Sequence, residues 1–218
     1  MRTSLPQSHQ RFPLTSILGT GGNVCLLRVL AGHGGPLSVS RLASDSGMST
    51  VGARAALAGL VGQGVVTVVG QGRAQLYALN STHPFTEPIK ALFAQERTHW
   101  DALQQELRAV LARFSRVKAA WLYGSAARSE DRPGSDIDIV LAVDDEVATT
   151  ADAVREAMQP LEDRYQAAIS VVALSPSDIL SRADSDAWWA DVVRDGQALK
   201  AAAPERYLSQ LRRAAVSA

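Results

Sequence analysis

The chain of 218 residues is 46% apolar, has one cysteine, and balances 22 lysines and arginines against 22 acids. This length predicts two domains, and no apolar run approaches the roughly 18 to 20 residues that span a bilayer. The N-terminal stretch lacks the pattern of a secretory signal, and a single cysteine excludes a disulfide within the chain. We therefore expect a cytoplasmic protein that does not partner with a membrane.

The zero net charge conceals an uneven distribution. Residues 1–83 carry six arginines and one acid, a net charge of +5, and residues 84–218 carry 16 bases and 21 acids, a net charge of −5. A basic N-terminal part is typical of a domain that meets a polyanion. Charge alone does not establish nucleic-acid binding, so the pattern of elements must support it.

The N-terminal pattern predicts three helices and a hairpin within residues 16–83, after a flexible N-terminus over residues 1–15. The helices are expected over residues 23–33, 38–46 and 49–64, the last one capped by Ser49 or Thr50. The β-rich runs 65–70 and 74–80 form the hairpin, whose loop contains Arg73. The third helix is expected to bury an apolar face made of Val51, Ala55, Leu57, Leu60 and Val61.

Three helices followed by a hairpin resemble the winged helix-turn-helix domain of bacterial transcription regulators, over roughly residues 16–82. In that family the start of the third helix enters the major groove, and the wing tip touches the backbone or the minor groove. The resemblance implies double-stranded DNA as a partner; a protein-protein adaptor is the alternative. It implies DNA contacts from Arg41, from Arg73 at the wing tip, and from the start of the third helix at Ser49, Thr50, Gly52, Ala53 and Arg54.

A linking helix is predicted over residues 84–115. It carries an apolar seam with heptad spacing, Trp100, Leu103, Leu107, Val110 and Phe114. Such a seam either joins two copies as a short coiled coil or packs against the following domain, and both remain open. A homodimer suits a two-fold symmetric DNA site and doubles the few basic contacts that one copy offers.

Residues 116–218 open with a predicted buried strand, VKAAWLYG, that turns into a short helix at Gly124 and Ser125. A glycine permits close backbone approach, and the serine and the helix start can donate hydrogen bonds to phosphate. The next strand, SDIDIVLAV, places Asp136 and Asp138 on one face by its period of two. Clustered carboxylates favour a divalent cation, and Mg²⁺ prefers one or two carboxylates together with substrate phosphate oxygens.

The stretch GSAARSEDRPGSDIDIVLAV resembles the signature of the nucleotidyltransferase superfamily, which includes DNA polymerase beta, with Ser129 where a glycine is common. The resemblance extends over about residues 116–200 and implies a mixed α/β domain, so the whole chain is expected to be α+β. It implies that Asp136 and Asp138 are the catalytic, metal-binding residues, with Mg²⁺ or Mn²⁺ and a nucleoside triphosphate as cofactors. The implied nucleotide-binding residues are Gly124, Ser125, Arg128, Arg132 and Ser135.

The superfamily places a third carboxylate on a later strand, and it aligns here with Ser170 in AAISVVAL. Serine supplies no negative charge, so transfer activity stays open, and Glu162, Asp163 and Asp178 lie out of phase with the strand. Three functions remain. The first is a DNA-binding transcription regulator whose second domain binds a metal-nucleotide complex. The others are an active transferase with a hydroxyl acceptor, and one component of a toxin-antitoxin pair with a small helical partner protein.

The C-terminal end, after residue 185, is expected to contain a helix, a strand and a last amphipathic helix. Trp188, Val192 and Val193 supply core contacts in the first of these helices. Trp189 is either a platform for base stacking or a core residue, and core packing is favoured because tryptophan contributes large burial.

Overall fold

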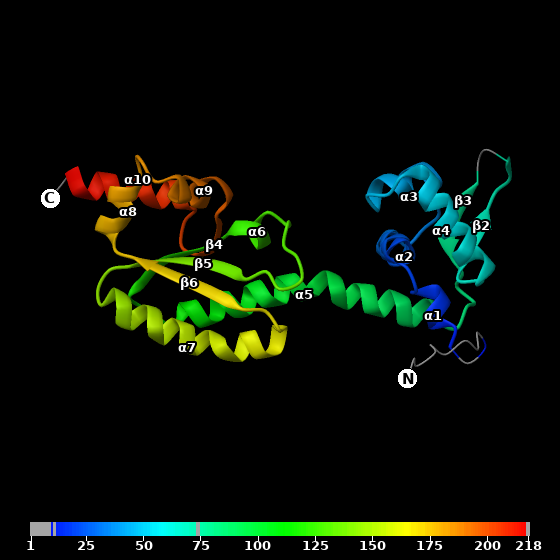
Figure 1. Ribbon diagram of the computed structural model, residues 1–218, viewed down its shortest axis with the longest axis horizontal. Helices are drawn as coiled ribbons and strands as arrows, with labels where there is room; N and C mark the ends of the chain where they lie inside the picture. Colours follow the sequence, from blue (N-terminus) through cyan, green and yellow to red (C-terminus); the bar gives the residue numbers. More distant parts are fainter. Residues whose placement is uncertain (1–9, 11, 73–74, 217–218) are drawn as a thin grey trace, which may run out of the picture. The chain divides into compact units, whose positions relative to one another are not determined.

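The computed structural model describes residues 10, 12–72 and 75–216, so Arg73 lies outside the described residues. The chain divides into two compact units, residues 1–99 and 100–218. The predicted α+β fold class is confirmed (Figure 1). Within the described ranges, no helix has both the length and the hydropathy needed to cross a membrane.

The first unit contains the predicted helices and hairpin, together with a short helix and a short strand that the sequence did not indicate. Over the described residues its sheet has the order β1-β3-β2, and both pairings are antiparallel. The bounds are α1 (Leu14–Ile17), α2 (Gly21–His33), β1 (Leu37–Ser38), α3 (Val39–Asp45), α4 (Thr50–Gly62), β2 (Val66–Val69), β3 (Leu76–Leu79) and α5 (Thr86–Ala112), the last of which continues into the second unit.

Hydroxyl caps set the starts of α2, α3 and α4. The side chains of Thr20, Ser38 and Ser49 accept hydrogen bonds from backbone N–H groups in the first turns of these helices. Each cap satisfies a donor that has no partner within its helix. Ser49, one of the two caps that the sequence indicated, thus sets the start of α4 at Thr50.

The buried face of α4 differs from the prediction. Ala53, Leu57 and Leu60 are at most 1% exposed, whereas Val51 is 79% exposed and Ala55 is also exposed. Alanine and glycine fill much of this helix, so its apolar residues do not mark one face. The sequence pattern therefore could not determine which side of the helix is buried. The expectation that Ala53 faces DNA is therefore wrong.

The second unit is built on a mixed sheet, as predicted. Its order is β6-β5-β4-β7 over the described residues; β5 and β6 are parallel and the other pairs are antiparallel. The bounds are β4 (Val117–Tyr123), α6 (Gly124–Ala127), β5 (Ile137–Val143), α7 (Val147–Tyr165), β6 (Ile169–Leu174), α8 (Pro176–Arg182), α9 (Ala187–Asp195), β7 (Gln197–Lys200) and α10 (Pro204–Val216).

Helices cover both faces of this sheet. One face packs against α7 and the second part of α5, and the other packs against α8, α9 and α10 (Figure 1). In α5, Leu103, Leu107 and Leu111 are at most 3% exposed in the core of this unit. The heptad seam therefore packs against the following domain, and its use as a coiled-coil dimer seam is not supported.

Trp189 belongs to the core between the sheet and α9. It is 1% exposed, and its ring meets that of Trp121 edge to face, with centroids 6.0 Å apart. The alternative role of base stacking is excluded by this burial. Trp188, beside it in sequence, is half-buried and contacts the ring of Tyr123.

Candidate functional site

Strand register brings Asp138 and Ser170, both singled out from the sequence, together with Tyr123 at one end of the second sheet. Asp138 pairs with Tyr123 on β4 and with Ser170 on β6. Paired residues on neighbouring strands project from the same face, here the face that packs against α8, α9 and α10. The serine that aligns with the third carboxylate of the superfamily is therefore the direct neighbour of Asp138.

Gly124 leaves the space in which the Asp138 carboxylate lies. Its φ is +77°, and a Cβ atom at this position would come within 2.5 Å of Asp138 Oδ2. A side chain would thus be strained by the backbone and would collide with the carboxylate. The glycine of the Gly-Ser pair allows α6 to begin directly beside Asp138.

The two aspartates form an uncompensated negative site. Asp136 is exposed and Asp138 is half-buried. Burial, and then the charge of Asp136, raises the pKa of Asp138. Among the described residues, the ion pairs within 4.0 Å include neither aspartate. A bound cation would relieve both the repulsion and the cost of burial.

The donor set fits a cation that takes further ligands from its substrate. Within residues 10, 12–72 and 75–216, no three or more His, Cys, Asp or Glu side chains are grouped to hold a metal ion. Two carboxylates are nevertheless a usual protein contribution to Mg²⁺ bound with substrate phosphates. The site therefore fits a metal-nucleotide complex better than a free structural metal.

The turn after α6 explains why a glycine is common at the position that Ser129 occupies. The Glu130 N–H donates to Ser125 O at 2.9 Å and the Ser129 N–H donates to Ala126 O at 3.2 Å. This is the Schellman arrangement, whose left-handed position favours glycine. Ser129 occupies it with a φ of +57°, so the chain carries backbone strain next to the Gly-Ser turn.

Contacts from α9 and β7 hold α6 in place. Arg128 pairs with Glu130 at 2.8 Å and with Asp195 at 3.1 Å, and Asp195 also pairs with Arg194. Gln197 Nε2 donates to Ala127 O at 2.7 Å. Arg128 is thus engaged by two carboxylates, and a role toward phosphate requires it to leave them.

The loop before β5 gives Ser135 a structural contact. Its Oγ accepts a hydrogen bond from the Arg132 N–H at 3.0 Å, and its own N–H donates to Arg132 O at 2.8 Å. These bonds close the turn that leads into Asp136. The side chain of Arg132 is exposed.

Two of the acids near β6 are engaged elsewhere and do not replace the missing carboxylate. Glu162 Oε1 accepts from the Ile169 N–H at 2.6 Å, which holds the start of β6. Asp178 forms a capping box with Ser175 at the start of α8. Ser170 therefore lies beside Asp138 on β6, and neither of these two acids supplies a third carboxylate there.

A second candidate surface lies in the first unit, around the start of α4. Ser49, Thr50 and Arg54 are exposed, and Gly52 is partly so. A hollow of about 310 Å³ is lined by Ser38, Val39, Ser40, Thr50, Arg54, Gly72 and Gln75. Val51, which the sequence pattern assigned to the buried face, is instead exposed next to Thr50 at the start of α4.

Arg41 has a partner near this surface. Its guanidinium pairs with Asp45 at 2.7 Å, four residues later on α3. The pair is exposed, and exposed pairs contribute little to stability. Arg41 can therefore exchange this carboxylate for a phosphate at low cost.

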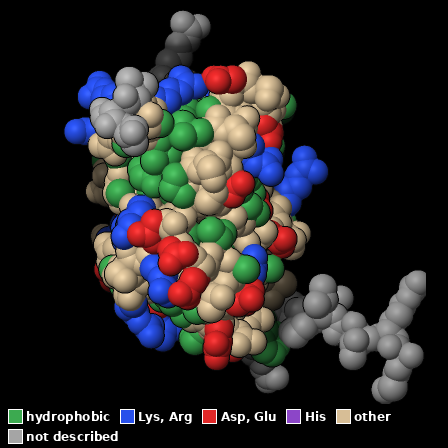
Figure 2. All heavy atoms as spheres, turned by 90° about the vertical axis from the view of Figure 1, so that its left-hand side faces the viewer, with side chains coloured by type: hydrophobic (Ala, Val, Ile, Leu, Met, Phe, Trp, Pro, Cys, Tyr) green, Lys and Arg blue, Asp and Glu red, His purple; other side chains and the backbone are tan. Residues whose placement is uncertain are grey.

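The surface of the second unit mixes charges of both signs. Figure 2 shows basic and acidic side chains interspersed on one face of the molecule. Ion pairs such as Arg116–Glu146, Lys118–Asp144 and Arg164–Glu106 account for part of this mixing. Asp136 and Asp138 differ from these paired acids.

Comparison with known proteins finds a family match over the segment in which the candidate site lies. Residues 105–184 match the family described as polymerase beta, nucleotidyltransferase. This segment contains Gly124, Asp136, Asp138 and Ser170. The chain therefore contains a nucleotidyltransferase domain of this type. No curated protein matches the sequence.

Solved structures show weaker likenesses. A mutant of the toxin-antitoxin MntA-HpeT is 18% identical over 52% of this chain and 87% of that chain, with a TM-score of 0.38. A toxin-antitoxin with AMP-PNP is 19% identical over the same shares, with a TM-score of 0.36. A homodimeric winged helix-turn-helix DNA-binding domain from Mycobacterium bovis, described as a possible ArsR-family regulator, is 24% identical over 45% and 91%, with a TM-score of 0.31. Scores this low carry no argument about function.

Proposed function

We propose that the protein is a DNA-binding transcription regulator whose nucleotidyltransferase domain binds a nucleoside triphosphate together with Mg²⁺ or Mn²⁺. One observation carries the nucleotide part of this proposal. Asp138 is a half-buried carboxylate with a raised pKa, next to Asp136 and against the glycine that opens α6. Such a pair is costly without a cation.

The residues of the site have separate roles in binding. Asp136 and Asp138 hold the metal ion, which when bound neutralises triphosphate charge and orients the reacting phosphate. Gly124 allows close approach of the backbone, and Ser125 can donate its hydroxyl hydrogen to a phosphate oxygen. The family match over residues 105–184 supports this assignment.

The DNA-binding part rests on the exposed start of α4 and on charge. Arg54 can donate two hydrogen bonds to a guanine or bind phosphate, and Val51 can contact the methyl group of a thymine. Arg41 is available for a phosphate, and residues 1–83 carry six arginines against one acid. DNA contact by Arg73 stays a prediction, since that residue lies outside the described part of the chain.

Nucleotidyl transfer is the second candidate function. Both aspartates and the Gly-Ser pair are retained, which favours it, whereas Ser170 occupies the place beside Asp138 where the superfamily has its third carboxylate. In the reaction, an acceptor hydroxyl would attack the α-phosphate and pyrophosphate would leave. Transfer of label from an α-labelled nucleotide that is lost in Asp136→Ala would establish this function. Absence of transfer in the parent, with a gain in Ser170→Asp, would establish Ser170 as the reason.

Calorimetric titration with each nucleoside triphosphate, with and without Mg²⁺, tests the nucleotide site directly. We expect Mg²⁺-dependent binding by the parent and none by the double variant Asp136→Asn, Asp138→Asn. The test needs no acceptor, so an inactive but binding domain is still detected. If neither protein binds any nucleotide, the proposed site is wrong.

Regulation further requires that the nucleotide changes the affinity for DNA. A ligand shifts an equilibrium only by its differential affinity for the two states. We expect the affinity for DNA from upstream of the protein's own gene to change when the Mg²⁺-nucleotide that binds is added. An unchanged affinity would leave two independent binding activities and would contradict the coupling.

A further inference from the structure

The short helix α6 meets two different environments at its two ends. It begins at Gly124 and Ser125, the turn proposed to receive phosphate, and it ends at Ala127. A helix of four residues leaves most of its backbone groups without partners inside the helix, so contacts from outside set its position. At its end, Gln197 Nε2 donates a hydrogen bond to Ala127 O at 2.7 Å. A contact that holds Ala127 therefore also holds the turn at Ser125.

Gln197 lies on the face of the sheet opposite Asp138. It is the first residue of β7 and pairs with Leu122 on β4, which belongs to the core that the sheet shares with α5 and α7. Asp138 pairs with Tyr123, the next residue along β4, which packs on the other face. Paired residues project from the same face, so Gln197 approaches α6 from the side of α5. It is a positioning residue for α6 and does not touch the metal site.

A chain of three hydrogen bonds joins α5 to α6 through Gln197. Arg108 Nη2 donates to Gln104 Oε1 at 2.8 Å, and both residues lie on α5. Gln104 Nε2 then donates to Gln197 Oε1 at 3.4 Å. Because a guanidinium only donates and a carbonyl only accepts, the two ends of the chain fix the direction of both amides. We call Gln104 and Gln197 the glutamine relay, since each accepts from the side of α5 and donates toward α6.

The strand β7 is also fixed to the end of α5. Lys200, the last residue of β7, donates from Nζ to Leu111 O at 2.9 Å and to Phe114 O at 2.7 Å. Such a lysine satisfies carbonyl groups that have no partner within the helix. The strand is thus held to α5 by its last residue, while its first residue holds α6.

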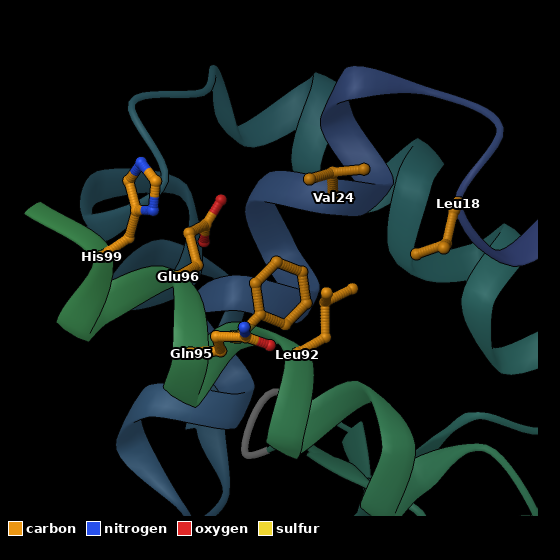
Figure 3. A pocket seen from close by; sticks show the side chains of 7 residues that line it. Leu18, Val24, Leu92, Gln95, Glu96 and His99 are labelled. Atoms are coloured by element: carbon orange, nitrogen blue, oxygen red, sulfur yellow. The ribbon is translucent and has the colours of Figure 1, made fainter. Parts of the chain in front are cut away.

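The helix α5 contributes side chains to the cores of both units. Phe93 is 2% exposed in the core of the first unit, and Leu107 is 0% exposed in that of the second. In the first unit α5 is fastened to α2, because Arg28 Nε and Nη2 donate to the Glu96 carboxylate oxygens at 2.6 and 2.8 Å. Figure 3 shows Glu96 on α5 and Val24 on α2 around one hollow. A change in α5 therefore involves an element that both cores require.

We infer that the glutamine relay couples the nucleotide site to α5, with Gln197 as the residue that positions α6. The inference rests on the proposed function, because it names the route by which the bound Mg²⁺-nucleotide changes the affinity for DNA. Phosphate bound at Gly124 and Ser125 shifts α6, and Ala127 O shifts with it. Gln197 then either follows and displaces Gln104, or loses a hydrogen bond. In both cases the contact with α5 differs in energy between the free and bound states, as coupling requires.

Calorimetric titration of the full chain with each nucleoside triphosphate and Mg²⁺ measures the positioning role. Gln197→Met keeps the length of the side chain but has no N–H to donate to Ala127 O. We expect nucleotide binding about three- to tenfold weaker than in the parent, the size expected for one lost hydrogen bond. Gln210→Met replaces an exposed glutamine on α10 of the same unit and should bind like the parent. Equal affinity in Gln197→Met and the parent would overturn this role.

Gln104→Met separates the coupling from nucleotide binding. It removes the donor to Gln197 Oε1 but leaves Gln197 Nε2 bonded to Ala127 O. Nucleotide and DNA affinities, each measured alone, should stay within about twofold of the parent, as for most surface substitutions. The change in affinity for DNA from upstream of the protein's own gene on adding Mg²⁺-nucleotide should be lost. A purely structural role for Gln104 would leave that change intact.

The outcomes distinguish this inference from the proposed function. If the parent binds no nucleotide, both are wrong. If the parent binds nucleotide and its DNA affinity responds, an equal response in Gln104→Met overturns the relay alone. If the DNA affinity of the parent does not respond, the relay is wrong and the nucleotide site stands. Thermal melts check that the variants fold, and Gln104→Met decides the coupling even if Gln197→Met does not fold.

Discussion

The two units of the chain present opposite kinds of surface. The first exposes large apolar side chains from α1, α4, β2 and α5, and residues 1–83 carry one acid. In the second unit, over the described residues, the large hydrophobic side chains are buried or only partly exposed, and many exposed acids and bases are paired. Asp136 and Asp138 are acids outside these pairs.

This difference in surface chemistry indicates which class of ligand each unit can bind. Broad apolar and basic surfaces suit macromolecules, such as DNA or a second copy, whose binding buries a large area. A small polar cluster beside a glycine suits a compact charged ligand bound through a metal ion. DNA binding without nucleotide, and nucleotide binding without DNA, should therefore each be unaltered by changes in the other unit, and the experiments below measure both activities for each variant.

The largest effect is expected for Gly124→Ala. A Cβ atom there would come within 2.5 Å of Asp138 Oδ2, in a backbone with φ of +77°. We expect calorimetry to show at least about a hundredfold loss of nucleotide affinity, comparable to losing support for a metal ligand, while DNA binding persists. Gly134→Ala is the control, because its φ is +89° but no atom lies within 4 Å of its Cβ position. Equal losses in both would show that backbone strain alone is responsible.

Arg54→Ala should affect DNA alone. Loss of a base or phosphate contact costs about 1 to 3 kcal/mol, or about a tenfold or larger change in affinity. If Arg54 contacts phosphate, the salt dependence of binding should fall by about one unit in fluorescence titrations at several salt concentrations. Arg97→Ala, an exposed arginine on α5 of the same unit, should bind DNA like the parent. Similar losses for both arginines would indicate nonspecific attraction and contradict a defined α4 surface.

Asp138→Asn should separate stability from nucleotide binding. The pKa of Asp138 is raised in the folded state by burial and by Asp136. Below the pKa of the unfolded state, the protonated Asp138 carries no charge penalty, and its contribution to stability is fully present. This contribution is lost as the pH rises through the folded-state pKa, and above that pKa the ionised carboxylate lowers the stability of the fold. At pH 7 the variant should be more stable than the nucleotide-free parent by about 0.5 kcal/mol, a small value because solvent still screens the carboxylate.

Thermal melts from pH 3 to 8 test whether Asp138→Asn stabilises the protein at neutral pH. The gain in stability should disappear at the acidic end of this range. Asp131→Asn changes an exposed aspartate in the preceding loop and serves as the control. A variant that is less stable than the parent at pH 7 would contradict an uncompensated charge at position 138. The same protein should lose Mg²⁺-dependent nucleotide binding.

The smallest effect on binding is expected for Ser129→Gly. The residue has a φ of +57° in the turn that ends α6. Glycine removes the left-handed strain but adds freedom to the unfolded chain, so the net gain in the free energy of unfolding should be up to about 1 kcal/mol. Chemical denaturation measures it, and DNA affinity should be unchanged. A destabilised variant would show that the serine hydroxyl has a role that offsets the strain.

How much the sequence could predict depended on the period of each element. A strand has only two faces, so the alternation of Asp136 and Asp138 with isoleucines was enough to set the side on which Asp138 lies. Ser170 was singled out by its alignment with the third carboxylate of the superfamily, and the register places it beside Asp138. In α4, alanine and glycine left the rotation undetermined, which misplaced Val51 and Ala53.

Other parts of the site had no signal in the sequence. Arg128 meets Asp195 across 67 positions, and Gln197 meets Ala127 across 70. Each contact depends on how α9 and β7 are laid beside α6, which no local pattern of residues specifies. The heptad seam was ambiguous for a similar reason, because an apolar stripe indicates burial without naming the partner.

The unfavourable setting of Asp138 has a consequence for the history of the protein. Most sequence changes that survive keep a protein above its stability threshold, and replacements that relieve a cost spread easily when no function opposes them. A carboxylate held at a loss beside another acid, against a glycine that no side chain can replace, is therefore the kind of feature that drift removes from a disused site. Its presence in this sequence agrees with the metal-nucleotide ligand that we propose for the two aspartates.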